Sequence, residues 1–236
     1  MGHRKARLPW RAKEEDKRMN KRKAFLTYII IFLLLVTVWY FLLYPQIEKL
    51  KSSYEILFIL LWFIGKAIFW ILPVFIYLRF IGIKDFGDFL KIRNKWISGV
   101  VWGILLSIFW VILRWLLFCV ILGHKNISFN IGSFYLIAGI LVGIFEEIPF
   151  RGLILQELNE QMKFWSANII STLIFLVYHI PTWIYSGQGY ANLLPNCFIV
   201  IFLGLIWGFM FKKTRSIWSV AIFHSLHDLS VYIDII

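Results

Sequence analysis

The stretch AFLTYIIIFLLLVTVWYFLLY, at residues 24–44, decides what kind of fold this chain can adopt. It holds 21 residues without one charged side chain, and about 20 apolar residues are needed for a helix to cross a bilayer. The run is too long for the core of a cleaved signal peptide, and no cleavage site of small residues follows it. We therefore interpret it as a membrane-spanning helix.

The rest of the 236-residue chain repeats this pattern. Sixty per cent of the residues are hydrophobic and 16% are charged, which excludes an ordinary soluble domain. The pattern predicts an all-α, polytopic helical membrane protein with about seven transmembrane helices. The predicted spans are 24–44, 55–80, 96–122, 133–156, 164–186, 191–211 and 216–236.

The positive charge of the chain is placed for a membrane surface. Ten of the 25 Lys and Arg residues fall within residues 1–23, ahead of the first span. Such a basic head predicts a cytoplasmic N-terminus, and the basic connections 81–95 and 212–215 fit alternating spans from that start. We expect a multi-pass protein of the cell membrane, in a bacterial plasma membrane. Its partner is the lipid bilayer, and no nucleic acid is expected.

The fourth span contains charged residues in the stretch GIFEEIPFRG, at 143–152. Ionisable groups inside a membrane are costly, so they are usually paired or functional. Glu147 and Arg151 are four residues apart, share one helix face and can form an ion pair. Glu146 is turned about 100° from its neighbour and has no local basic partner. It is therefore the candidate general base.

The same span shows two further signals near this carboxylate. Pro149 cannot donate a hydrogen bond, so the carbonyl of Phe145 must find another donor or face a wet cavity. Gly139 and Gly143 lie one turn apart, which predicts that a neighbouring helix comes close.

Two later spans carry imidazoles. His179 lies halfway along the fifth span, just before Pro181. In the last span His224 and Asp228 lie four apart on one face, with His227 beside them. Polar groups clustered on membrane helices indicate a shared cavity.

These residues leave several kinds of chemistry open. In hydrolysis by an activated water, Glu146 would be the base and His179 would position the water, while His224 and Asp228 would stabilise the oxyanion. In a catalytic metal site, Glu146, His179 and His224 would be three zinc ligands, although no HExxH pair is present.

A transporter is the third class. Lys66, Arg114, Glu146 and Asp228 could form an ion or proton path through the membrane. The chain has no internal repeat of the kind that many transporters show.

Three motifs follow one another on successive spans: EEIPFR at 146–151, FLVYH at 175–179 and HSLHD at 224–228. In this order they resemble the CPBP family of intramembrane endopeptidases. That family takes in CAAX-type proteases and bacteriocin-processing or self-immunity proteins, also called the Abi family. A non-catalytic scaffold for bacteriocin self-immunity or signalling is an alternative within it.

The resemblance covers residues 133–231, which would be the catalytic membrane core. The apolar spans and the charge pattern divide the remainder into N-terminal transmembrane helices at 24–132 and a basic cytoplasmic head at 1–23.

The resemblance implies a helical bundle with a cavity open to the cytoplasmic side, where a peptide or protein substrate binds. It implies a glutamate protease that needs no cofactor, although a divalent metal has also been considered for the family. Glu146 and His179 would activate the water, and His224 and Asp228 would serve the oxyanion.

The remaining motif residues, Glu147 and Arg151, would have a supporting role. Asp228 is a departure, because the family pattern allows Asn here and an ionised Asp cannot donate to an oxyanion. We hypothesise that Asp228 instead holds His224 as a charged donor.

Overall fold

The computed structural model describes residues 9–121, 123, 127–129, 131–231 and 233–235. The first eight residues of the predicted basic head therefore lie outside the described part. Almost all described residues are helical, which confirms an all-α membrane fold, and the departure is one pair of short strands.

The helices and strands follow one another along the chain, and π-helical segments join several of the helices. The elements are α1 (Pro9–Val38), α2 (Tyr44–Glu48), α3 (Glu55–Lys66), α4 (Leu72–Phe80), α5 (Phe86–Phe89), α6 (Trp96–Trp115), β1 (Ile127–Phe129), α7 (Ser133–Glu147), α8 (Gln156–Gln161), α9 (Phe164–Tyr185), α10 (Tyr190–Thr214), α11 (Ile217–Val231) and β2 (Ile233–Ile235).

Six helical stretches of the described chain are long and apolar enough to cross a membrane. They correspond to the first six predicted spans. The last predicted span, 216–236, is shorter than expected, because α11 ends at Val231 after 15 residues. At about 1.5 Å per residue it reaches about 22 Å, less than the ~30 Å hydrocarbon core. The chain then enters β2, which pairs antiparallel with β1.

Prolines explain where several long helices widen. Pro45 follows a π-helical segment in which the Tyr44 N–H bonds the carbonyl of Trp39, five residues earlier. Pro149 lies inside the π-helical segment Ile148–Leu155. A proline has no N–H to give the carbonyl four residues before it, so the wider turn re-pairs the neighbouring groups. The π-helical segment Ile148–Leu155 begins directly after Glu146 and Glu147.

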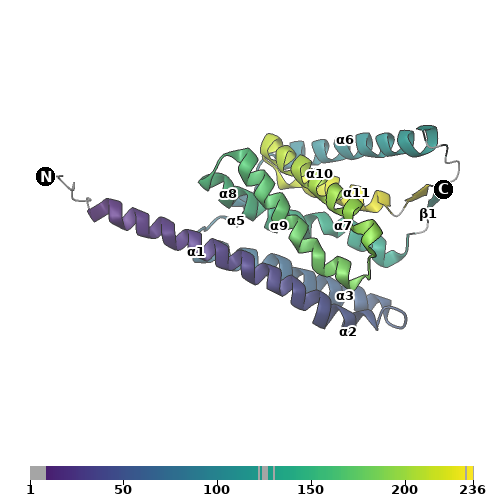
Figure 1. The fold of residues 1–236 in the computed structure, drawn as a ribbon, viewed down its shortest axis with the longest axis horizontal. Helices are drawn as coiled ribbons and strands as arrows, with labels where there is room; N and C mark the ends of the chain where they lie inside the picture. The colour runs from purple at the N-terminus through teal and green to yellow at the C-terminus, as the bar shows by residue number, and fades with distance from the viewer. Residues whose placement is uncertain (1–8, 122, 124–126, 130, 232, 236) are drawn as a thin grey trace.

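Helix α11 packs against α6 and α7. Figure 1 shows α1 along one side, with its N-terminal half projecting beyond the other helices, and α6 along the opposite side. A Cβ added at Gly143 of α7 would lie 2.0 Å from the Ala221 carbonyl oxygen of α11, and one at Gly139 would lie 2.5 Å from Leu229. One at Gly103 of α6 would lie 2.9 Å from another α11 side chain. The predicted close approach is thus confirmed, and the neighbouring helix is α11.

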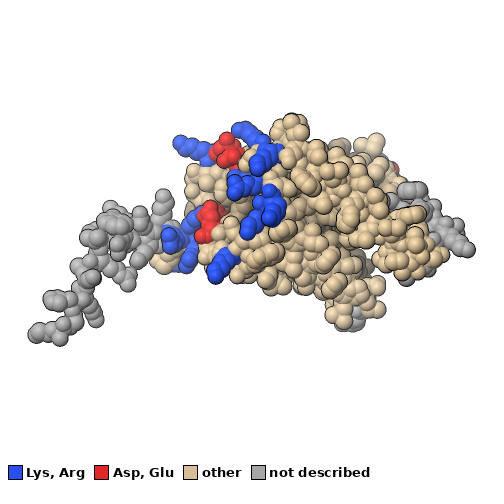
Figure 2. All heavy atoms as spheres, turned by 90° about the horizontal axis from the view of Figure 1, so that it is seen from above, with Lys and Arg blue, Asp and Glu red and all other residues tan. Residues whose placement is uncertain are grey.

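Basic side chains gather at one end of the bundle. Figure 2 shows Lys and Arg as a band next to the N-terminal part of α1. This end carries the described start of α1 and the connections α4–α6, α8–α9 and α10–α11. The band is what the positive-inside rule expects of a cytoplasmic face. The side of the membrane itself stays a prediction.

Candidate active site

The second glutamate of the pair is the centre of a buried network. Glu147 is 0% exposed, and its Oε1 accepts from Arg151 Nη1 at 3.0 Å. The same oxygen lies 2.7 Å from Nδ1 of His224, on α11. Arg151 also donates to the Gly204 carbonyl at 3.1 Å. The ion pair predicted from the spacing is confirmed, and this network joins α7, α10 and α11.

Aromatic rings enclose these charges. The Arg151 guanidinium lies over the ring of Phe175, 4.6 Å from its centroid, and 5.4 Å from that of Trp207. The Trp207 ring stacks on His224 with centroids 4.0 Å apart. Such a site excludes water, so its electrostatic interactions are strong and a lost partner is costly.

Glu146 points to a different set of partners. Its Oε1 accepts from the Tyr178 hydroxyl at 2.7 Å, and that hydroxyl accepts from the Trp70 indole at 2.9 Å. Its Oε2 lies 3.9 Å from Nε2 of His224. The carboxylate is therefore held by a tyrosine from α9, while its second oxygen is not bound by a hydrogen-bond donor among the described residues.

Glu146 lines a cavity of about 270 Å³ together with His179 of α9 and Asp228 of α11. His179 is half-buried, and its Nδ1 lies 2.7 Å from the Phe175 carbonyl. This contact leaves Nε2 as the ring nitrogen available to the cavity. The volume is large enough for several waters or a short stretch of peptide.

His224 lies behind this wall and is not among the residues that line the cavity. Its Nε2 is 3.8 Å from Asp228 Oδ1, compared with 2.7 Å between its Nδ1 and Glu147. Asp228 therefore does face His224, as the sequence analysis predicts. The stronger contact comes from the second glutamate, on another helix.

Lys66, from α3, also lines the cavity. Its side chain is 3% exposed, and its Nζ is 3.4 Å from the Tyr40 hydroxyl. The ammonium lies over the Trp70 ring, 3.7 Å from the centroid, with Trp62 farther away at 5.9 Å. The described residues offer it no carboxylate at ion-pair distance, so its partners are the Tyr40 hydroxyl and aromatic rings.

The described residues contain no group of three His, Cys, Asp or Glu side chains arranged to hold a metal ion. The Nδ1 atoms of His179 and His224 contact a carbonyl and a carboxylate, respectively. Arg114, the other base of the predicted transporter path, contacts the Ser230 carbonyl. It does not line the cavity.

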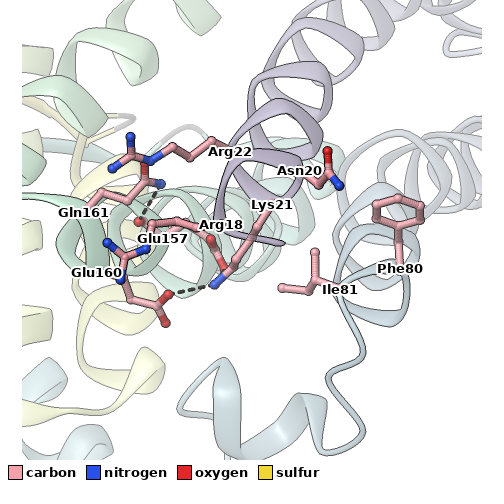
Figure 3. Close-up of a pocket in the computed structure, with 9 residues that line it drawn as sticks. All are labelled: Arg18, Asn20, Lys21, Arg22, Phe80, Ile81, Glu157, Glu160 and Gln161. Carbon is pink, nitrogen blue, oxygen red and sulfur yellow. Dashed lines mark hydrogen bonds and ion pairs between the residues drawn. The ribbon is translucent and has the colours of Figure 1, made fainter. Parts of the chain in front are cut away.

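A wider hollow of about 780 Å³ lies at the basic end of the bundle. Figure 3 shows Lys21 of α1 reaching toward Glu157 and Glu160 of α8. The Lys21 Nζ lies 3.2 Å and 2.7 Å from their carboxylate oxygens. This contact ties the first helix to the region after the glutamate pair, far from the imidazoles.

All six predicted site residues are thus close together. Glu146, Glu147, Arg151 and His224 form one buried cluster, and within it only Glu146 lines the cavity. His179 and Asp228 also line the cavity. Sequence reasoning missed Tyr178 and Trp207. Tyr178 directly precedes the motif histidine, but nothing in the sequence says which carboxylate it would reach.

Fold and site together define a multi-pass membrane protein with a carboxylate and an imidazole facing an intramembrane cavity. Residues 128–230 match the family described as Type II CAAX prenyl endopeptidase Rce1-like. This match contains all three motifs and is consistent with the CPBP family of membrane proteases. No curated protein and no solved structure matches the chain.

Proposed function

We propose that the protein is an intramembrane endopeptidase that hydrolyses a peptide bond of a membrane-associated peptide or protein. The observation that carries the proposal is that the two adjacent glutamates have different surroundings. Glu147 is held by Arg151 and His224 inside the protein. Glu146 and His179, from two different helices, face the same cavity. A family of proteases supports the same reaction class.

In this reaction a water lies between Glu146 and Nε2 of His179. Glu146 takes a proton from the water as the oxygen attacks the peptide carbonyl carbon. The proton then passes to the leaving nitrogen as the C–N bond breaks, which yields a carboxylic acid and an amine. The Tyr178 hydroxyl holds Glu146 in place throughout.

His224 and Asp228 act beside this centre. His224 lies between Glu146 and Asp228 and is anchored by Glu147, so three carboxylates surround one imidazole. This environment favours a charged ring, which would stabilise the negative oxygen of the tetrahedral intermediate. Asp228 has the role of holding the charged ring.

The test is cleavage of a peptide library by the purified protein in detergent, read by mass spectrometry. Glu146→Gln and His179→Ala should abolish cleavage, and Glu146→Gln, which keeps the size of the side chain, should leave thermal stability unchanged. Glu147→Ala should lower stability as well, because Arg151 and His224 both lose their partner. A chelator should have no effect. If a chelator abolished cleavage and zinc restored it, Glu146, His179 and His224 would instead be assigned as metal ligands.

A scaffold would behave differently. Wild-type protein that cleaves no peptide, together with a cellular phenotype that Glu146→Gln leaves intact, would replace the enzyme with a non-catalytic member of the family.

A further inference from the structure

The hollow at the basic end of the bundle is a second cavity, separate from the catalytic one. Its volume is about 780 Å³, and none of its lining residues lines the cavity of Glu146. Three helices that are distant in the sequence form it. Its lining comes from the start of α1, the end of α4 and α8: Arg18, Asn20, Lys21, Arg22, Phe80, Ile81, Glu157, Glu160 and Gln161.

This hollow lies where three candidate membrane spans begin or end. The uncharged run of α1 begins at Ala24, two residues after Arg22. The helical stretches Glu55–Phe80 and Ser133–Gln161 both end at residues that line the hollow. The ends of spanning helices, where charged residues replace apolar ones, lie at the level of the lipid headgroups. The hollow is therefore at headgroup level, and this holds for either orientation of the chain.

Two arginines in the hollow have no acidic partner. Lys21 is held by Glu157 and Glu160, because its Nζ lies 3.2 Å and 2.7 Å from their carboxylate oxygens. Arg18 and Arg22 lie four residues apart on one face of α1 and extend toward α8 in Figure 3. Among the described residues, no carboxylate lies within ion-pair distance of either guanidinium group.

This charge arrangement favours a bound anion. Like charges four residues apart on a helix destabilise it, so an anion between the two guanidinium groups would stabilise α1. The two carboxylates in the lining share Lys21, and the five charged side chains together leave one positive charge in excess.

We propose that this hollow binds the headgroup phosphate of an anionic phospholipid. A guanidinium group can donate two parallel hydrogen bonds to phosphate oxygens, and Arg18 and Arg22 present two such groups from one helix face. Asn20 adds an amide donor beside them. Phe80 and Ile81 give the hollow an apolar wall, which suits the glycerol and acyl part of a lipid and which a free phosphate ion would not use. Basic pockets between membrane helices bind anionic headgroups through the same chemistry.

Native mass spectrometry of the full-length protein in a non-ionic detergent tests the site. The protein is titrated with phosphatidylglycerol and with phosphatidylcholine of the same acyl chains. The test variant is Arg18→Gln/Arg22→Gln. The matched control is Lys84→Gln/Lys213→Gln, which removes the same charge from exposed positions at the same end of the bundle, outside the hollow.

We expect one phosphatidylglycerol to bind the wild type at least tenfold more tightly than phosphatidylcholine. The test variant should bind it about 30-fold more weakly, because each basic residue beside an anionic lipid contributes about fivefold in affinity. The control should lose less than about threefold, because distant exposed charges are screened. Equal losses in the two variants would show a diffuse surface charge and overturn the proposal. Equal affinities for the two lipids would overturn it too.

Inorganic phosphate distinguishes a lipid site from a site for a free anion. Millimolar sodium phosphate should displace no more phosphatidylglycerol than sodium chloride of the same ionic strength. Displacement by phosphate alone would assign the hollow to the free ion and overturn the assignment to a lipid.

Thermal unfolding in the same detergent shows whether each variant is folded. Phosphatidylglycerol should raise the unfolding temperature of the wild type and of the control, but not of the test variant. A second variant leaves both arginines in place: Phe80 is 76% exposed, so Phe80→Ser should fold, and it should bind the lipid at least threefold more weakly. An unchanged affinity in Phe80→Ser would place the lipid elsewhere and overturn the proposal.

Discussion

Removing the Arg151 guanidinium should strongly destabilise the protein. The side chain is 1% exposed and makes two hydrogen bonds, to Glu147 at 3.0 Å and to Gly204 at 3.1 Å. In Arg151→Met the carboxylate of Glu147 stays buried, and His224 is its one remaining hydrogen-bond partner among the described residues. Breaking one side of a buried pair typically costs about 3–5 kcal/mol, so a loss of this size is expected.

The assay is reversible unfolding in mixed micelles, with the same denaturant series for every variant. Arg93→Met is the matched control, because the Arg93–Asp85 pair is 3.3 Å long but 76% and 56% exposed. Exposed pairs contribute about 0–1 kcal/mol. The comparison thus isolates burial, since both variants lose an arginine–carboxylate pair.

A double variant shows where the loss arises. Most of the cost in Arg151→Met comes from the stranded charge, so Glu147→Gln in the same chain should recover at least half of it. A loss below about 1 kcal/mol in the single variant would refute the reasoning. So would a double variant less stable than the single one.

Three further outcomes follow from the geometry. Gly143→Ala should lower the free energy of unfolding by at least about 2 kcal/mol and also lower activity, because the added Cβ would lie 2.0 Å from a carbonyl oxygen of α11. Leu136→Ala, at an exposed position of the same helix, is the control in the unfolding assay. Lys66→Met should lower kcat about 10²-fold with little change in KM, because the cavity loses its ammonium donor, whereas Lys49→Met should not; equal kcat values would end this idea. Asp228→Asn should lower kcat/KM about tenfold or more if the carboxylate holds the charged imidazole, and full activity would show that it does not.

The sequence by itself determined those features that depend on spacing along one helix. The uninterrupted run at 24–44 is long enough to span a bilayer, and it lies within the longer helical stretch Arg18–Glu48. Glu147 and Arg151 pair because residues four apart share a helix face, wherever that helix packs. Gly139 and Gly143 predict a close neighbour for the same reason, although not which helix it is.

Only the tertiary structure decided the contacts between helices. His224 lies 3.8 Å from Asp228, its neighbour on the same helix, but 2.7 Å from Glu147 on another. The donor to Glu146 is Tyr178, from α9. Such contacts depend on the rotation and crossing of packed helices, and no spacing within one segment encodes these. For the same reason Lys66, from the N-terminal half of the chain, is placed on the cavity wall by packing alone.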